Sequence, residues 1–369
     1  VQALRRCAAR APGYWQGGNH LSQVRRKIDQ KNLKSEESAV TAADFPYAYE
    51  NKRYHTLSYE NKKRGYKLYK AVVDAGFTCP NIDGSRGRGG CIFCSGGSGY
   101  FTAPPEISVQ NQINAELARL RRKDKSARAI AYFQAHTNTY ASPTQLQFLY
   151  EQALACEGIA GLSIATRPDT LPDAVLDLLS ELARRTALTV ELGLQTIHEA
   201  TAVRINRCYP LGVFEHAFHA LKGRGIRVCV HLINGLPGEP PEMMLQSAAY
   251  LGQLKPDAVK LQMLHIIRGT AMEPLFTSGQ YRPMSLEEYV QLVCCQLELL
   301  PPEIVIERLT GDGDKKTLLA PLWTTDKLRV LGSIDQTLAR WNSWQGRCVS
   351  APEACIRDFC RAARCAGDA

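Results

Sequence analysis

Short apolar runs alternate along the chain with longer segments in which apolar residues recur every three or four positions. The runs have the length of β-strands and lie at residues 71–77, 128–133, 161–165, 188–195, 226–233 and 258–264. The segments between them have helical spacing and lie at residues 107–123, 143–156, 172–185, 216–223 and 243–254. A steady strand–helix alternation is typical of a parallel sheet covered by helices. We therefore predict an α/β fold, a partial (β/α)6 TIM-like barrel, with residues 304–308 as a candidate further strand.

Three cysteines, Cys79, Cys91 and Cys94, follow the first predicted strand. Cys91 and Cys94 have the CxxC spacing that lets two thiolates bind one metal centre. The long gap before them contains glycines that allow tight bends, at Gly84, Gly87, Gly89 and Gly90. Three thiolates leave one iron of a [4Fe–4S] cluster open, whereas a structural zinc site is normally closed by four ligands. The loop alone is compatible with a cluster, with zinc or with unrelated cysteines.

Polar residues and glycines gather where the predicted strands end. In a β/α barrel these strand ends carry the active site. Arg167, after the third strand, could bind an oxyanion through its planar fork or form a structural ion pair. Glu191 and Gln195 lie four residues apart on one strand, so both are expected to point into the barrel. The other candidates are Gln134 and Asn138 after the second strand and Gly235 and Gly238 after the fifth.

The cysteine loop and these strand ends, in this order, resemble the radical SAM superfamily. In that superfamily three cysteines hold a [4Fe–4S] cluster, and the fourth iron binds S-adenosylmethionine. The commonest spacing there is CxxxCxxC. The longer first gap of this chain resembles the uncharacterised YhcC/YtqA-like branch, which is related to the Elongator catalytic subunit. The resemblance covers residues 54–346 and implies that Cys79, Cys91 and Cys94 are the cluster ligands and that S-adenosylmethionine is the second cofactor.

The resemblance also implies roles for the strand ends. Gln134 and Asn138 stand where the superfamily has a Gly-Gly-Glu stretch that binds the methionyl amino group, so an oxygen ligand is expected there. Arg167 lies in a Thr-Arg-Pro-Asp segment like that of the Elongator-type enzymes. The remaining matches are Glu191 and Gln195, which resemble a segment that reaches the ribose hydroxyls, and Gly235 and Gly238, which resemble the loop on the adenine side.

Composition and charge narrow the class of protein. The chain has 369 residues and a formal net charge of +9, which favours polyanionic partners. Its longest apolar runs are strand-sized and its N-terminus lacks an apolar core segment, so we expect neither a membrane span nor a secretory signal. Thirteen cysteines without a regular framework favour reduced thiols and a metal site. We expect a cytoplasmic protein, with import into an organelle as the alternative.

The chain divides into three expected parts. Residues 1–45 form a basic appendage that is expected to be poorly ordered, and residues 46–346 form the radical SAM core with a C-terminal extension. Residues 347–369 form a tail that carries Cys348, Cys355, Cys360 and Cys365. The tail is compatible with a second cluster or with an extra surface helix over residues 351–363.

The start of the core interleaves aromatic and basic residues. Residues 46–70 combine several tyrosines with Lys62, Lys63 and Arg64. Such a segment suits stacking on bases and contact with phosphates, or it simply closes the bottom of the barrel.

The resemblance implies an enzyme that cleaves S-adenosylmethionine reductively to a 5′-deoxyadenosyl radical. It also implies an electron donor such as flavodoxin or ferredoxin. Kinship with the Elongator subunit and the basic charge point to tRNA, with wobble uridine as the expected target. The alternatives are a radical enzyme acting on a small molecule or peptide, or a non-catalytic metal-binding module.

Overall fold

A computed structural model describes residues 45–95, 102–134 and 136–365, with side chains up to residue 361 in the last helix. The predicted N-terminal appendage lies outside the described residues except for Phe45. In the described part of the chain, no helix is both long and apolar enough to cross a membrane.

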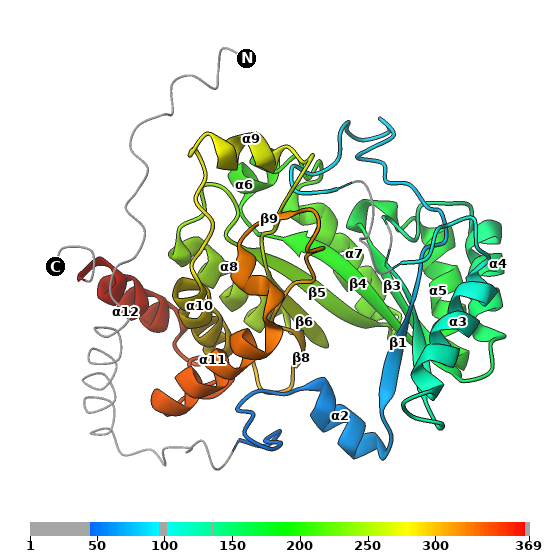
Figure 1. Cartoon of the computed structure of the whole chain (residues 1–369), viewed down its shortest axis with the longest axis horizontal. Helices are drawn as coiled ribbons and strands as arrows, with labels where there is room; N and C mark the ends of the chain where they lie inside the picture. Colours follow the sequence, from blue (N-terminus) through cyan, green and yellow to red (C-terminus); the bar gives the residue numbers. More distant parts are fainter. Residues whose placement is uncertain (1–44, 96–101, 135, 366–369) are drawn as a thin grey trace.

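Seven parallel strands form one curled sheet in the order β1-β2-β3-β4-β5-β6-β8 (Figure 1). The strands are β1 (Leu68–Val73), β2 (Arg128–Phe133), β3 (Ile159–Thr166), β4 (Ala187–Gln195), β5 (Arg227–Asn234), β6 (Ala258–Met263) and β8 (Val305–Arg308). The predicted partial barrel is confirmed, and the candidate strand at residues 304–308 becomes its seventh strand beside β6. A short antiparallel pair, β7 (Ile266–Ile267) and β9 (Leu318–Ala320), lies outside this sheet.

Helices alternate with the strands along the chain. They are α3 (Val109–Arg121), α4 (Pro143–Leu154), α5 (Asp173–Arg185), α6 (Glu199–Arg204), α7 (Leu211–Gly223), α8 (Pro241–Leu254), α9 (Met272–Thr277), α10 (Leu286–Leu299), α11 (Lys327–Arg340) and α12 (Pro352–Cys365). Of these, α3, α4, α5 and α7 pack on the sheet, whereas α11 and α12 pack on other helices. The apolar stripe of α5 shows why the spacing predicted these helices. Val175, Leu179 and Leu182 recur at helical intervals and are all buried in the main core.

The first strand ends earlier than its apolar run predicts. β1 stops at Val73, although the run continues to Phe77. Asp74 accepts the N–H of Gly76 through Oδ1 at 3.0 Å, and Gly76 has φ of 72°. This turn, which glycine permits without strain, redirects the chain into the cysteine loop.

The basic segment before β1 lies at the end of the sheet where the parallel strands begin. Helix α2 (Leu57–Arg64) is capped by Thr56, which pairs with Ile306 of β8. The helix then leads directly into the start of β1, so it lies at the end opposite the cysteine loop (Figure 1). Lys62 lies 5.0 Å from the ring centroid of Tyr49. This position corresponds to the interpretation in which the segment closes the bottom of the barrel.

A buried carboxylate holds the interior of the half-barrel. Glu191 of β4 is fully buried, and its two oxygens together accept donors from five other strands. Oε1 accepts from Lys70 Nζ at 3.1 Å and from Ser163 Oγ at 2.7 Å. Oε2 accepts from Tyr132 OH at 3.0 Å and from His231 Nε2 at 2.8 Å, and it is also in direct contact with Lys260 Nζ. Hydrogen-bonded and paired in this way, a charge can stay in the barrel interior.

The lysines set the protonation states of this network. Burial alone would raise the pKa of Glu191, but Lys260 and Lys70 hold it well below its usual range. Burial and the nearby Lys260 lower the pKa of His231. His231 is therefore neutral, and its Nε2–H donates to Glu191. The network has one carboxylate anion facing two ammonium groups, and it is complete at neutral pH.

Replacing Glu191 by Gln should lower the free energy of unfolding by about 3–5 kcal/mol, because Lys260 would keep a buried charge without its partner. Glu307→Gln is the matched control. Glu307 is also buried, but its partners Lys70 and Arg227 are 30% and 34% exposed, so water can solvate them. We expect this control to lose about 1 kcal/mol or less in urea unfolding at neutral pH. Equal losses in the two variants would contradict the role assigned to Glu191.

The same variant should change the response to acid. Because the folded-state pKa of Glu191 is depressed, its stabilisation is complete above the unfolded-state value of 4.5. The stabilisation is lost as the pH falls through the lower folded-state pKa. Glu191→Gln should therefore flatten the loss of stability on the acid side.

Candidate active site

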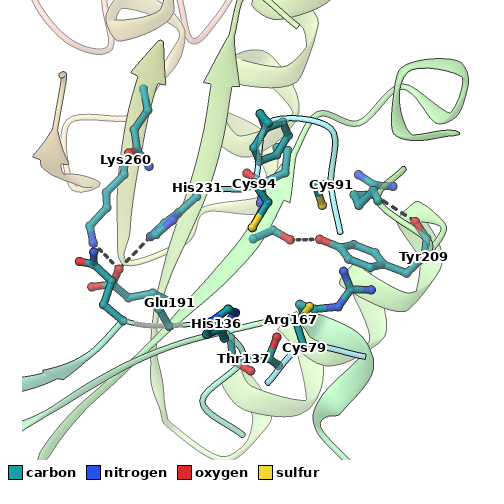
Figure 2. Close-up of a pocket in the computed structure, with 18 of the residues that line it drawn as sticks. Cys79, Cys91, Cys94, His136, Thr137, Arg167, Glu191, Tyr209, His231 and Lys260 are labelled. Atoms are coloured by element: carbon teal, nitrogen blue, oxygen red, sulfur yellow. Dashed lines mark hydrogen bonds and ion pairs between the residues drawn. The ribbon is translucent and has the colours of Figure 1, made fainter. Parts of the chain in front are cut away.

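The three cysteines after β1 line one cavity of about 320 Å³ at the C-terminal ends of the strands. In Figure 2, Cys91 and Cys94 lie in the upper part of the view with Cys79 below them, and Lys260 and Glu191 lie to the left. The loop and the barrel interior therefore face each other across one space. The position of the three cysteines directly after the first strand predicted that their loop would meet the other strand ends.

Asn81 fixes the shape of the cysteine loop. Its fully buried amide donates to the Asn206 carbonyl at 2.6 Å and toward Cys91 Sγ at 3.6 Å. Gly87 packs directly on it, since a Cβ at that position would lie 2.1 Å from Asn81 Oδ1. Asn206 in turn donates through Nδ2 to the Gly90 carbonyl at 2.7 Å. The segment after α6 thus anchors the loop, through contacts that local sequence patterns do not reveal.

The chemistry of the thiols fits a metal centre. Burial raises the pKa of the Cys91 thiol to about 12, although Arg167 nearby favours the thiolate. Such a thiol keeps its proton at neutral pH unless a metal ion replaces it. Cys79, Cys91 and Cys94 all line the cavity, and three thiolates fit a [4Fe–4S] cluster with one open iron.

Three of the predicted strand-end residues, Gln134, Arg167 and Gln195, line the same cavity. Arg167 pairs with Asp169 through Nε at 2.9 Å and Nη2 at 2.8 Å. Its guanidinium lies 4.8 Å from the ring centroid of Tyr209. Burial would lower the pKa of Arg167, but the bonds with Asp169 outweigh burial and raise it. Arg167 is therefore a fixed cation that forms a structural ion pair and still faces the cavity.

Gln195 reaches the cavity through an irregularity at the end of β4. It has φ of 67°, and the pairing with β5 shifts between Gly193 and Gln195. A Cβ at Gly193 would lie 2.6 Å from Gln195 Nε2, so the glycine lets this amide fold back over the strand. Tyr209 closes the same corner by donating to the Gly193 carbonyl at 2.5 Å. Glu191 also lines the cavity, but its oxygens are engaged in the interior network.

Asn138 does not line this cavity in the described part of the chain. Its side chain is fully buried, and its Nδ2 donates to the Ala165 carbonyl at 2.9 Å. The backbone N–H of Asn138 donates to the same carbonyl at 3.2 Å. Asn138 thus joins the segment after β2 to the end of β3, and its side chain is turned toward Ala165 and not toward the cavity.

Gly235 and Gly238 also lie away from the cavity lining. The carbonyl of Gly235 accepts from Tyr281 OH at 2.5 Å, and the two residues line a separate small cavity. A Cβ at Gly238 would collide with Arg204 Nη1, which donates to the Pro237 carbonyl. Both glycines have positive φ, so turn geometry and close packing account for them here.

Several cavity residues were not predicted. Lys260 and Gln262 of β6, together with Tyr132 and Tyr209, line the cavity. The alternation along β6 contains a signal for two of them, because Lys260 and Gln262 are separated by Leu261 and share one face of the strand. Tyr209 lies in an irregular segment after α6, where no periodicity applies.

Comparisons with known proteins agree with this geometry. Residues 82–251 match the model of the radical SAM superfamily, and residues 256–340 match that of the Radical_SAM C-terminal domain. The uncharacterized protein YtqA of Bacillus subtilis is 44% identical over 305 residues, which are 82% of this chain and 95% of YtqA.

Two further matches are more distant. The solved structure of an N-terminally truncated archaeal Elp3 from Methanocaldococcus infernus has a TM-score of 0.57 and is 17% identical in sequence. The match covers 73% of this chain and 63% of that one, and at this identity it shows a similar fold. The tRNA uridine(34) acetyltransferase of Methanocaldococcus jannaschii is 29% identical over 154 residues, or 41% of this chain and 28% of that protein. The chain belongs to the radical SAM superfamily, in the group of YtqA and YhcC, and is an enzyme whose cofactors are a [4Fe–4S] cluster and S-adenosylmethionine.

Proposed function

We propose that Cys79, Cys91 and Cys94 hold the cluster and that S-adenosylmethionine binds in the cavity beside them. The observation that carries this proposal is that three thiols and polar strand-end side chains share one space of about 320 Å³. When bound and reduced, the cluster would supply the electron that splits S-adenosylmethionine into methionine and a 5′-deoxyadenosyl radical able to take a hydrogen atom from substrate. We further propose a cytoplasmic enzyme with an electron donor such as flavodoxin or ferredoxin.

Different side chains around the cavity would bind different parts of S-adenosylmethionine. Arg167, held by Asp169, offers a fixed cation to the methionyl carboxylate. Gln134 would orient the methionyl amino group, and Gln195 would bind the ribose hydroxyls. Glu191 is the support of this wall and not a ribose ligand, because both of its oxygens already accept donors.

The wall opposite the cysteines is polar and cationic. Lys260, Gln262 and Arg308 line it, and Lys260 is anchored by the interior network. Such a wall suits a substrate rich in hydrogen-bond acceptors, such as a pyrimidine base. We propose a uridine of tRNA at the wobble position, supported by the partial similarity to a tRNA uridine(34) acetyltransferase and by the net charge of +9. An acidic small molecule or peptide would suit the same wall and is the second candidate.

Two exposed arginines of the cysteine loop support a polyanionic substrate. Arg86 and Arg88 lie in the sequence between Ile82 and Cys91, which line the cavity. The carbonyl of Arg88 accepts from Asn206 Nδ2 at 3.1 Å, so the backbone that carries these cations is anchored. Lys62 and Arg64 are equally basic but belong to α2 at the far edge of the sheet. We therefore assign phosphate contacts to Arg86 and Arg88.

Replacing any one of Cys79, Cys91 or Cys94 by Ala should abolish the iron content of anaerobically reconstituted protein, which we expect to be about four irons per chain. The same variants should form no 5′-deoxyadenosine from S-adenosylmethionine with dithionite. Cys156→Ala, which removes a buried thiol from outside the cavity, should keep both properties. A wild-type protein that takes up no iron on reconstitution would refute the assignment.

Gln195→Ala should weaken the binding of S-adenosylmethionine about ten-fold, the usual size of the effect when hydrogen bonds are lost, and should leave the iron content unchanged. Equilibrium binding to the reconstituted protein measures this change. Gln147→Ala, on the exposed surface of α4, is the control. If Gln195→Ala binds the cofactor as tightly as the control does, the ribose site lies elsewhere.

Reversing Arg86 and Arg88 to Glu should weaken tRNA binding and reduce the slope of log affinity against log salt by about 1.5–2, because two phosphate contacts are lost. Lys62→Glu with Arg64→Glu applies the same change of charge at the opposite end and should leave tRNA affinity near that of wild type. Iron content and uncoupled 5′-deoxyadenosine formation should be unchanged in both proteins. Equal effects of the two pairs of substitutions would contradict an RNA contact at Arg86 and Arg88 of the cysteine loop.

The substrate itself is tested by comparing tRNA nucleosides from cells with and without the protein. A uridine derivative that disappears in its absence, and that reappears when the purified enzyme acts on that tRNA, is the expected result. Unchanged nucleosides, together with active cleavage of S-adenosylmethionine, would favour the small-molecule or peptide candidate.

A further inference from the structure

The tail after α11 returns to the end of α10 and brings two cysteines to a buried glutamate. Cys348 donates its backbone N–H to the Glu298 carbonyl at 2.8 Å. Cys355 lies in the first turn of α12, which packs against α8 and α10. Figure 1 shows α12 beside α10, on the side of the molecule away from β1. This group of side chains is therefore separate from the cavity at the cysteine loop.

The three side chains converge on one point. Their ligand atoms all lie within 4.8 Å of one another. Glu298 Oε2 is 3.9 Å from Cys348 Sγ and 3.7 Å from Cys355 Sγ. A tetrahedral zinc ion with Zn–S bonds of about 2.3 Å and a Zn–O bond of about 2.0 Å requires an oxygen–sulfur separation of about 3.5 Å. The observed separations are close to that value, before any ion draws the ligands together.

The other oxygen of Glu298 is already held in place. Glu298 is fully buried, and its Oε1 accepts from the Ser343 hydroxyl and lies 3.8 Å from Arg347 Nη1. This arrangement orients Oε2 toward the two sulfurs, as the outer partners of metal ligands typically do. Two thiolates and one carboxylate would carry three negative charges. A divalent ion together with the nearby Arg347 guanidinium would offset these charges.

We propose that Glu298, Cys348 and Cys355 bind a zinc ion, with a water molecule as its fourth ligand, and that this ion fastens α12 to the barrel. Thiolate and carboxylate donors within reach of one ion are typical of zinc. The group has only two thiolates, fewer than the three or four that hold an iron–sulfur cluster. Loading displaces two thiol protons, and the energy of metal binding adds to the burial of Ile356 and Phe359, the side chains with which α12 joins the core.

The test measures iron and zinc together in the full-length, cluster-reconstituted protein by elemental mass spectrometry. We expect about one zinc per chain besides the iron of the cluster. Cys348→Ser with Cys355→Ser should lose the zinc and keep the iron, which also shows that the barrel is folded. Replacing Cys79, Cys91 and Cys94 by Ser should lose the iron and keep this zinc. The control Cys156→Ser should keep both metals.

A second measurement tests how Glu298 is held. Ser343→Ala should weaken zinc binding about 10–100-fold in competition with a chelator, because Oε1 loses its donor. Removing zinc from the wild-type protein should speed proteolysis of α12, and the double serine variant should be cleaved as fast with zinc as without it. Zinc content that is equal in wild type and the double serine variant would overturn the proposal. So would a Cys348–Cys355 disulfide in protein kept under reducing conditions.

Discussion

The structure depends on one buried carboxylate. Glu191 lies on the central strand β4 and accepts donors from β1, β2, β3, β5 and β6. It thereby links six neighbouring strands from the inside, while helices pack on the outside. A fully paired carboxylate can lie beneath an open cavity, because its hydrogen bonds satisfy it inside the barrel while its partners tolerate nearby water.

The same network defines one wall of the cavity. Lys260 and His231 are held by Glu191 and also line the cavity, so the group that links the strands also orients side chains of this wall. The opposite wall is the cysteine loop, which Asn81 and Asn206 hold against the segment after α6. The cavity is thus bounded by two rigid parts built in different ways. Such rigidity is what a site needs if it must hold two cofactor groups in fixed relation and exclude water.

The two cysteine groups of this chain have different surroundings. The three thiols after β1 line a cavity of about 320 Å³, which fits a centre of several irons. The two thiols of the tail lie within 4.8 Å of each other and of a glutamate oxygen, which fits a single ion. The tail group exists only in the folded chain, because Cys348 and Cys355 meet Glu298 only when the tail packs on α10.

Sequence by itself determined the order of strands and helices, the partial barrel, the cysteine loop and the presence of Gln134, Arg167 and Gln195 at strand ends. These features follow from periodicity and from the rule that a parallel barrel gathers its C-terminal strand ends, so they need only local information. The tertiary structure alone decided that Asn138 turns toward Ala165, that Gly235 lies under Tyr281, and that Glu191 supports the wall. It also decided that a helix in the tail meets a buried glutamate. Turn geometry and contacts between residues far apart in the chain control these outcomes, and neither is encoded in the spacing of residues along one element.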